Sequence, residues 1–79
     1  MKTTMYESSK ESISANEVMT VIITDSENVK REYGVKAIDV VDNNFANQQI
    51  KEHKEVYETE VKEIDVLTYD GKKFKTITI

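Results

Sequence analysis

The chain has 79 residues, no cysteine and no proline, and its net charge is −4 from 15 acidic and 11 basic residues. A chain of this length builds one domain with one modest core, which leaves little room for a deep substrate cavity. The lack of cysteine excludes disulfides, thiolate chemistry and zinc sites that need sulfur, and no apolar run approaches the ~20 residues of a membrane helix, so we expect a cytoplasmic protein.

The first fourteen residues are polar and rich in serine and threonine, with few large apolar side chains. This composition is typical of a flexible N-terminal tail or of a weak edge element. We therefore expect a tail over residues 1–14 and a single α+β domain over residues 15–79.

The next segments predict a β-hairpin. Glu17–Thr24 is β-branched and strongly apolar, as in a central strand, and Asp25–Asn28 has the composition of a turn. Val29–Ala37 then alternates apolar and polar residues, which favours a second strand. A helix capped near Asp25 is the alternative, and Gly34 would weaken it.

Apolar residues next recur at helical spacing, and they predict a helix from about Asp39 to His53. The run Asp42–Asn44 is a poor helix interior, so it either interrupts the helix or caps one that begins there. Residues 56–63 fit both a continued helix and a strand with one charged face. Their valine, tyrosine and threonine content favours the strand.

The C-terminal residues carry the clearest local signal. Asp70-Gly71 between two β-rich runs, Ile64–Tyr69 and Lys73–Ile79, is typical of a two-residue type I′ turn with Gly71 at positive φ. The order of elements is then ββαββ. We expect two β-hairpins that form one small antiparallel sheet, with one helix packed on one face.

Charge is distributed unevenly, and this suggests two candidate binding surfaces. Residues 55–65 alone sum to −4, and their acids are the candidate contacts for a protein with a basic surface: Glu55, Glu58, Glu60, Glu63 and Asp65. In a strand, Glu58 and Glu60 would share one face. The plainer interpretation is a solvated sheet face that protects an edge from aggregation.

The turn after Asp70 is basic, and its lysines are the alternative candidate contacts, in this case for RNA or DNA: Lys72, Lys73 and Lys75. Lysines beside Phe74 match phosphate contacts combined with stacking. Three lysines are a small footprint on an acidic chain, so nucleic-acid binding is the less favoured hypothesis.

No pattern indicates catalysis, a metal or a cofactor. His53 is the only histidine and is flanked by charged residues, so we expect a solvent-facing or boundary position on a helix, without a partner for acid–base chemistry. The acids from Asp39 to Asn44 lack the spacing and the glycine of a calcium loop. The sequence therefore favours a small non-catalytic accessory or inhibitor domain that binds a protein, of the kind encoded by phages and mobile elements.

Overall fold

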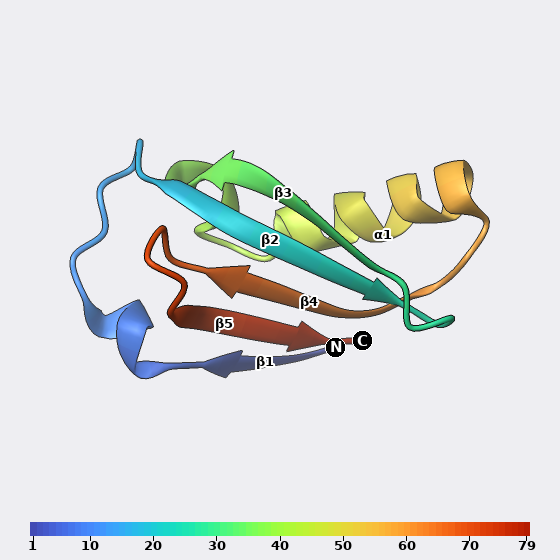
Figure 1. Cartoon of the computed structure of the whole chain (residues 1–79), viewed down its shortest axis with the longest axis horizontal. Helices are drawn as coiled ribbons and strands as arrows, with labels where there is room; N and C mark the ends of the chain where they lie inside the picture. The colour runs from blue at the N-terminus through green and yellow to red at the C-terminus, as the bar shows by residue number, and fades with distance from the viewer.

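Five antiparallel strands form one sheet, and one helix covers one of its faces (Figure 1). The computed structural model describes all of residues 1–79. In chain order, with η for 3₁₀ helices, the elements are β1 (Lys2–Met5), η1 (Glu7–Lys10), β2 (Val18–Asp25), β3 (Lys30–Lys36), η2 (Ala37–Val40), α1 (Asn44–Tyr57), β4 (Val61–Leu67) and β5 (Lys73–Thr78).

The sheet order is β1-β5-β4-β2-β3, so β1 and β3 are the edges. The predicted α+β class and both hairpins, β2–β3 and β4–β5, are confirmed. The simple ββαββ arrangement with a free tail is wrong, because Lys2–Met5 is the weak edge element that was the alternative to a tail, and it adds a fifth strand beside β5. All four residues of β1 are exposed, so backbone pairing rather than side-chain burial defines this strand.

The core lies between the sheet and α1. Cross-strand register places alternate residues of the inner strands on the covered face. The buried apolar side chains are Met19, Val21, Ile23, Ala37, Val40, Ala46, Val61, Ile64, Val66 and Ile77.

The helix begins and ends later than predicted. Residues 37–40 form the separate turn η2, and the carboxylate of Asp42 accepts the backbone N–H of Asn44 at 2.8 Å. This local hydrogen bond competes with helix formation before Asn44. The helix continues to Tyr57 and stops at Glu58, which adopts the left-handed conformation at φ 60°. The preference for a strand across residues 56–63 was therefore wrong for its first half, since β4 starts at Val61.

The last turn is a hairpin of a different type from the one predicted. Gly71 has φ 85°, as expected, but Asp70 is not at positive φ, so the type I′ turn is excluded. The N–H of Gly71 donates to the carbonyl of Thr68, and the N–H of Thr68 donates to the carbonyl of Lys72. This is a three-residue loop with glycine in the left-handed position. The Thr68 hydroxyl also donates to Asp70, which holds the pKa of that carboxyl below its usual value.

Candidate functional site

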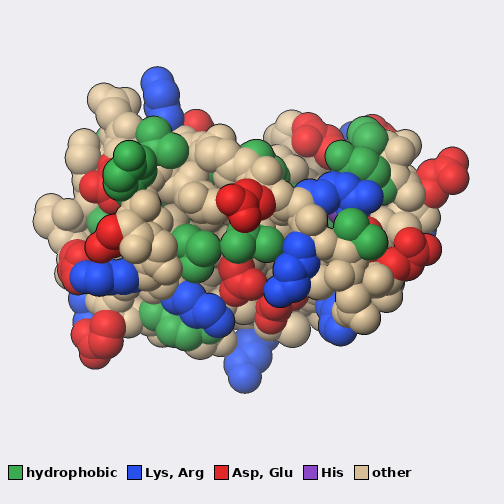
Figure 2. Space-filling view, viewed as in Figure 1, with side chains coloured by type: hydrophobic (Ala, Val, Ile, Leu, Met, Phe, Trp, Pro, Cys, Tyr) green, Lys and Arg blue, Asp and Glu red, His purple; other side chains and the backbone are tan.

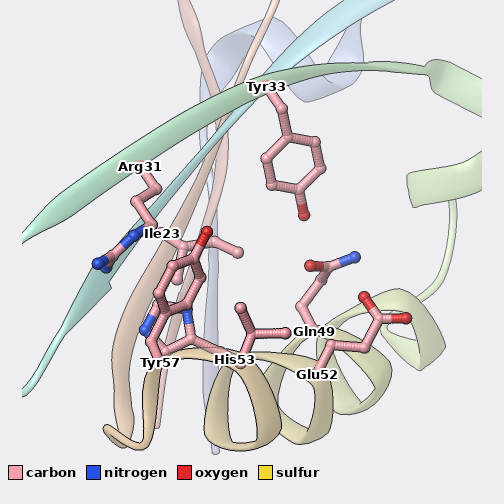
Figure 3. A pocket seen from close by; sticks show the side chains of 8 residues that line it. Ile23, Arg31, Tyr33, Gln49, Glu52, His53 and Tyr57 are labelled. Carbon is pink, nitrogen blue, oxygen red and sulfur yellow. The ribbon is translucent and has the colours of Figure 1, made fainter.

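A pocket of about 340 Å³ opens between the edge strand β3 and the C-terminal half of α1 (Figure 3). The strands β2 and β3 supply Ile23, Arg31 and Tyr33, and the helix supplies Gln49, Glu52, His53, Val56 and Tyr57. Figure 3 shows the Tyr33 ring extending from the strand towards the helix, and Arg31 extending over Tyr57. The pocket therefore joins two segments that the sequence separates by a turn and a 3₁₀ helix.

A buried carboxylate lies beside this pocket. Asp25 ends β2 with only 1% of its surface exposed, and its Oδ1 accepts the backbone N–H groups of Glu27 and Val29 at 2.9 and 3.0 Å. Its Oδ2 accepts Nη1 of Arg31 at 3.0 Å and the hydroxyl of Thr59 at 3.2 Å. Four donors from the turn, from β3 and from the loop after α1 thus converge on one carboxylate.

Burial alone would raise the pKa of Asp25, because it penalises the charged form. The hydrogen bonds from the Val29 backbone, from Arg31, from the Glu27 backbone and from Thr59 act against burial and lower the pKa to about 2. The donors therefore outweigh desolvation, and Asp25 is an anion under all ordinary conditions.

His53 is the fifth donor to this cluster, so the expectation of a solvent-facing or boundary histidine is wrong. It is 4% exposed, and its Nε2 lies 3.0 Å from Oγ1 of Thr59 and 3.4 Å from Oδ2 of Asp25. Because the carboxylate only accepts and the Thr59 proton is directed to it, Nε2 carries a proton, which it donates to the nearer Thr59 oxygen and to the buried carboxylate. This arrangement ties α1 to the end of β2 and keeps the imidazole Nε2 away from solvent.

Two aromatic contacts complete this end of the molecule. The guanidinium carbon of Arg31 lies 3.6 Å from the centre of the Tyr57 ring, and the Tyr57 and His53 rings are 4.7 Å apart. Tyr57 remains 46% exposed and Val56 69% exposed. The outer rim of the pocket is thus partly apolar and open to solvent.

The Tyr33 hydroxyl is buried without a hydrogen-bond partner. Burial and the negative charge of Glu52 raise the pKa of Tyr33 to about 12. The phenol therefore stays neutral inside the pocket.

The structure does not gather the five candidate acids on one surface. Glu55, Glu58 and Glu60 are exposed at the end of α1 and in the loop that follows it. Glu63 and Asp65 project from β4 on the uncovered face, where Asp65 accepts the Thr76 hydroxyl at 2.6 Å. The first three thus form a group of their own beside the pocket, although Glu60 is paired with Lys54.

The three candidate lysines are also separated. Lys72 is exposed between Glu11 and Asp70, and Lys73 is exposed with its ammonium 5.5 Å from the centre of the Tyr6 ring. Lys75 is only 3% exposed, and its ammonium donates to the carbonyl of Val40 at 2.7 Å and to Oδ1 of Asn43 at 3.0 Å. Lys75 therefore contacts the protein interior, while the other two lysines face solvent.

Figure 2 shows acidic and basic side chains interspersed over the face in view, with only a small purple area for the histidine. A second groove near the other end of α1 is apolar, with Ile13, Ile38, Val41 and Phe74 in its lining. No cluster of three or more His, Cys, Asp or Glu side chains has the arrangement to hold a metal ion. No helix is long and apolar enough to cross a membrane.

Comparisons with family models, with curated proteins and with solved structures found no match.

The sequence did not indicate that Asp25, Arg31 and Thr59 belong to one buried cluster, or that Tyr33 lines the pocket beside it. Asp25 was recognised only as a turn residue, and Arg31 and Tyr33 only as alternating members of a strand. One signal was available: Arg31 and Tyr33 alternate with exposed residues, so they share the covered face of an edge strand. Their association with the helix depends on contacts between distant segments.

Proposed function

We propose that this chain is a small non-catalytic domain that acts by binding a protein with a basic surface, as an inhibitor or accessory factor. The binding surface is the C-terminal end of α1 together with the open rim of the adjacent pocket. The observation that carries the proposal is the combination, at one place, of exposed acids with exposed apolar and aromatic side chains.

The charge at this place supports a basic partner. Residues 52–60 contain four glutamates and one lysine, an excess of three negative charges out of a net −4 for the chain. Lys54 is paired with Glu60, which leaves Glu52, Glu55 and Glu58 without a cation close enough to form an ion pair. Such a cluster attracts and orients a basic partner during encounter.

The apolar component supports affinity as well as attraction. Val56 is largely exposed and Tyr57 about half exposed on the same turn of the helix, and the Arg31 guanidinium packs on the Tyr57 ring and holds it in place. A rigid aromatic side chain beside a shallow pocket is the typical anchor of a protein interface. The acids would then determine the rate of association, and the anchor its lifetime.

The buried polar groups support a non-catalytic role. The His53 Nε2 proton is shared between Thr59 and Asp25, and the Thr59 hydroxyl donates to Asp25, so neither group is arranged to activate a substrate. The cluster serves to fix the end of α1 and thereby to position the proposed binding surface.

The test compares two charge reversals of equal size. Glu55→Lys with Glu58→Lys changes the proposed surface, and Glu7→Lys with Glu11→Lys makes the same change of +4 on η1 and the residue after it. The unmodified protein and the η1 control should capture the same host protein, with binding that weakens as salt rises, whereas the α1 reversal should lose it. All three should have similar melting temperatures, because exposed charges contribute little to stability.

Equal capture by both reversals would contradict the proposed surface. A gel-shift titration against RNA and DNA addresses the alternative. Tight, salt-sensitive binding by the unmodified protein that is lost in Lys72→Ala with Lys73→Ala would replace a protein partner by a nucleic acid.

A further inference from the structure

The outer edge of β3 has free backbone hydrogen-bonding groups. β2 and β3 pair in register, and the bonds that flank this ladder run from Ala37 N–H to Glu17 and from Asp25 N–H to Val29. Because hydrogen-bonded pairs alternate along an antiparallel ladder, the odd-numbered residues of β3 bond to β2. The N–H and C=O groups of the even-numbered residues therefore point outwards, away from β2: Lys30, Glu32, Gly34 and Lys36.

The side chains of these four residues lie on the uncovered face of the sheet, and all four residues are exposed. On the other face, Tyr33 and Val35 are half-buried. An unpaired edge of this kind accepts another strand, provided that opposite charges on the two strands face each other.

We infer that β3 pairs with β3 of a second copy of this chain, antiparallel and centred on Gly34, to form a continuous ten-stranded sheet across the dimer. In this register Glu32 lies opposite Lys36 of the second copy, and Lys36 lies opposite its Glu32. On the helix side, Tyr33 lies opposite Val35 of the second copy, which is a favourable aromatic and β-branched pair.

The competing registers are less favourable. Centring on Tyr33 places Lys30 opposite Lys36, and centring on Glu32 places two glutamates opposite each other. Centring on Arg31 opposes Lys30 to Glu32, but it sets the two Arg31 residues against each other and overlaps only the first part of each strand. The Gly34 register is the one that matches charge over the longer overlap, from Glu32 to Lys36.

The dimer goes beyond the proposed function because it determines how many binding surfaces one assembly carries. The C-terminal end of α1 lies beside the β2–β3 turn, where Arg31 contacts Tyr57 (Figure 1). A two-fold axis through Gly34 places the two turns at opposite ends of the ten-stranded sheet. The assembly is then bivalent, with its two acidic surfaces far apart.

Sedimentation equilibrium of the unmodified chain should show a dimer that dissociates on dilution. Glu32→Lys opposes lysines to lysines and Lys36→Glu opposes acids to acids, so each variant alone should be monomeric. Mixed in equal amounts, these two variants should form a heterodimer, because both lysines of the first variant then meet glutamates of the second. The double variant, with both changes in one chain, should restore the homodimer.

Glycine at the centre allows a second test of the backbone contact. Gly34→Pro removes an N–H that points outwards and should abolish the dimer while the ladder with β2 is kept. Gly34→Ala is its control, since the added Cβ would meet Val18 Cγ1 at 3.5 Å and the Met19 carbonyl oxygen at 3.9 Å, both ordinary contacts. A chain that stays monomeric at its highest soluble concentration would overturn the inference, and so would a dimer that neither single charge variant weakens.

Discussion

Two buried charges hold the two ends of α1 against the sheet, and their partners come from different parts of the chain. Asp25 lies at the C-terminal end of the helix, and its five donors include two backbone N–H groups from its own turn. Lys75 lies at the N-terminal end, and its acceptors are the carbonyl of Val40 and the side chain of Asn43, more than thirty residues away.

The difference follows from what each group needs. A carboxylate accepts hydrogen bonds, and a turn supplies free N–H groups within a few residues. An ammonium donates, and free carbonyls are found at the C-terminal ends of helices, such as Val40 at the end of η2. The anion is therefore held mainly by local structure, and the cation only by the completed fold.

The largest effect is expected from removing the anion. Asp25→Ala leaves Arg31, Thr59, His53 and two backbone N–H groups without their shared acceptor, and the arginine with an unpaired charge. We expect the melting temperature to fall by more than about 10 °C. Thermal unfolding followed by circular dichroism measures this, and a fall of only a few degrees would show that water replaces the carboxylate.

Asp25 should also make the free energy of unfolding fall in acid. The pKa of Asp25 is about 2 in the fold, against an ordinary value of 3.8. Its contribution is therefore present above pH 3.8 and is lost as the pH falls towards 2, because the unfolded chain takes up the proton first. Asp25→Asn should flatten the acid limb of a urea-unfolding series over this range, and an unchanged slope would contradict the assignment.

A smaller loss is expected at the helix side of the anion. His53→Ala removes a buried ring and one of the five donors, so the free energy of unfolding should fall by about 1–3 kcal/mol. His53→Gln retains a donor at similar reach and should recover part of this loss in urea titrations. If alanine caused no loss, the imidazole would be dispensable, and Thr59 and Arg31 would be sufficient to hold Asp25.

The comparison also shows which features could be predicted from sequence. The two hairpins could be predicted, because β-branched alternation and Asp70-Gly71 are local signals. Strand β1 could be predicted only as an alternative to a tail, since its residues are all exposed and it forms only by pairing with β5. The helix boundaries shifted because Asp42 bonds to a nearby N–H and Glu58 ends the last turn in a left-handed conformation.

The burial of His53 and of Lys75 was hidden for a related reason. Flanking lysines and glutamates made His53 resemble a surface residue, although its burial depends on Asp25, 28 residues away. Lys75 was grouped with Lys72 and Lys73 by proximity. Lys75 pairs with Val66 and Ile77 pairs with Ile64, so both side chains lie on the covered face, and the register shift in this ladder lies beyond them, beside Leu67. Alternation with Phe74 and Thr76 already contained that signal.

Replacing the cation should have a smaller effect than replacing the anion. Lys75→Met keeps the stem packed and removes a desolvated charge, so the free energy of unfolding should stay within about 1–2 kcal/mol of its original value. Lys75→Ala is the contrast, because it also removes the packing and should destabilise more. Equal losses in the two variants would show that the ammonium contacts matter more than the stem.

The contribution of Lys75 to stability depends on pH with the opposite sign to the contribution of Tyr33. Burial lowers the pKa of Lys75 below 10.5, although the nearby Asp42 opposes the shift. The folded chain therefore releases the proton before the unfolded chain does, and Lys75 makes the protein more stable as the pH rises towards 10.5. Lys75→Met should lack this alkaline gain in urea titrations between neutral pH and 10.5.

The smallest effect is expected for Tyr33, whose hydroxyl is one of two buried side-chain polar groups without a hydrogen-bond partner, the other being that of Thr24. Tyr33→Phe loses no hydrogen bond and should change the free energy of unfolding at neutral pH by less than about 1 kcal/mol.

The effect of Tyr33→Phe on the free energy of unfolding should appear in alkali. With a pKa of about 12 in the fold and 10.0 ordinarily, the phenol stabilises the protein fully below pH 10, and this stability is lost as the pH rises towards 12. Tyr33→Phe should flatten that decline in urea titrations, whereas Tyr33→Ala should destabilise at every pH because the ring itself packs against the core. A loss of several kcal/mol in the phenylalanine variant at neutral pH would mean that the Tyr33 hydroxyl has a hydrogen-bond partner. Asp25, Lys75 and Tyr33 would then all be held by specific contacts between the sheet and α1.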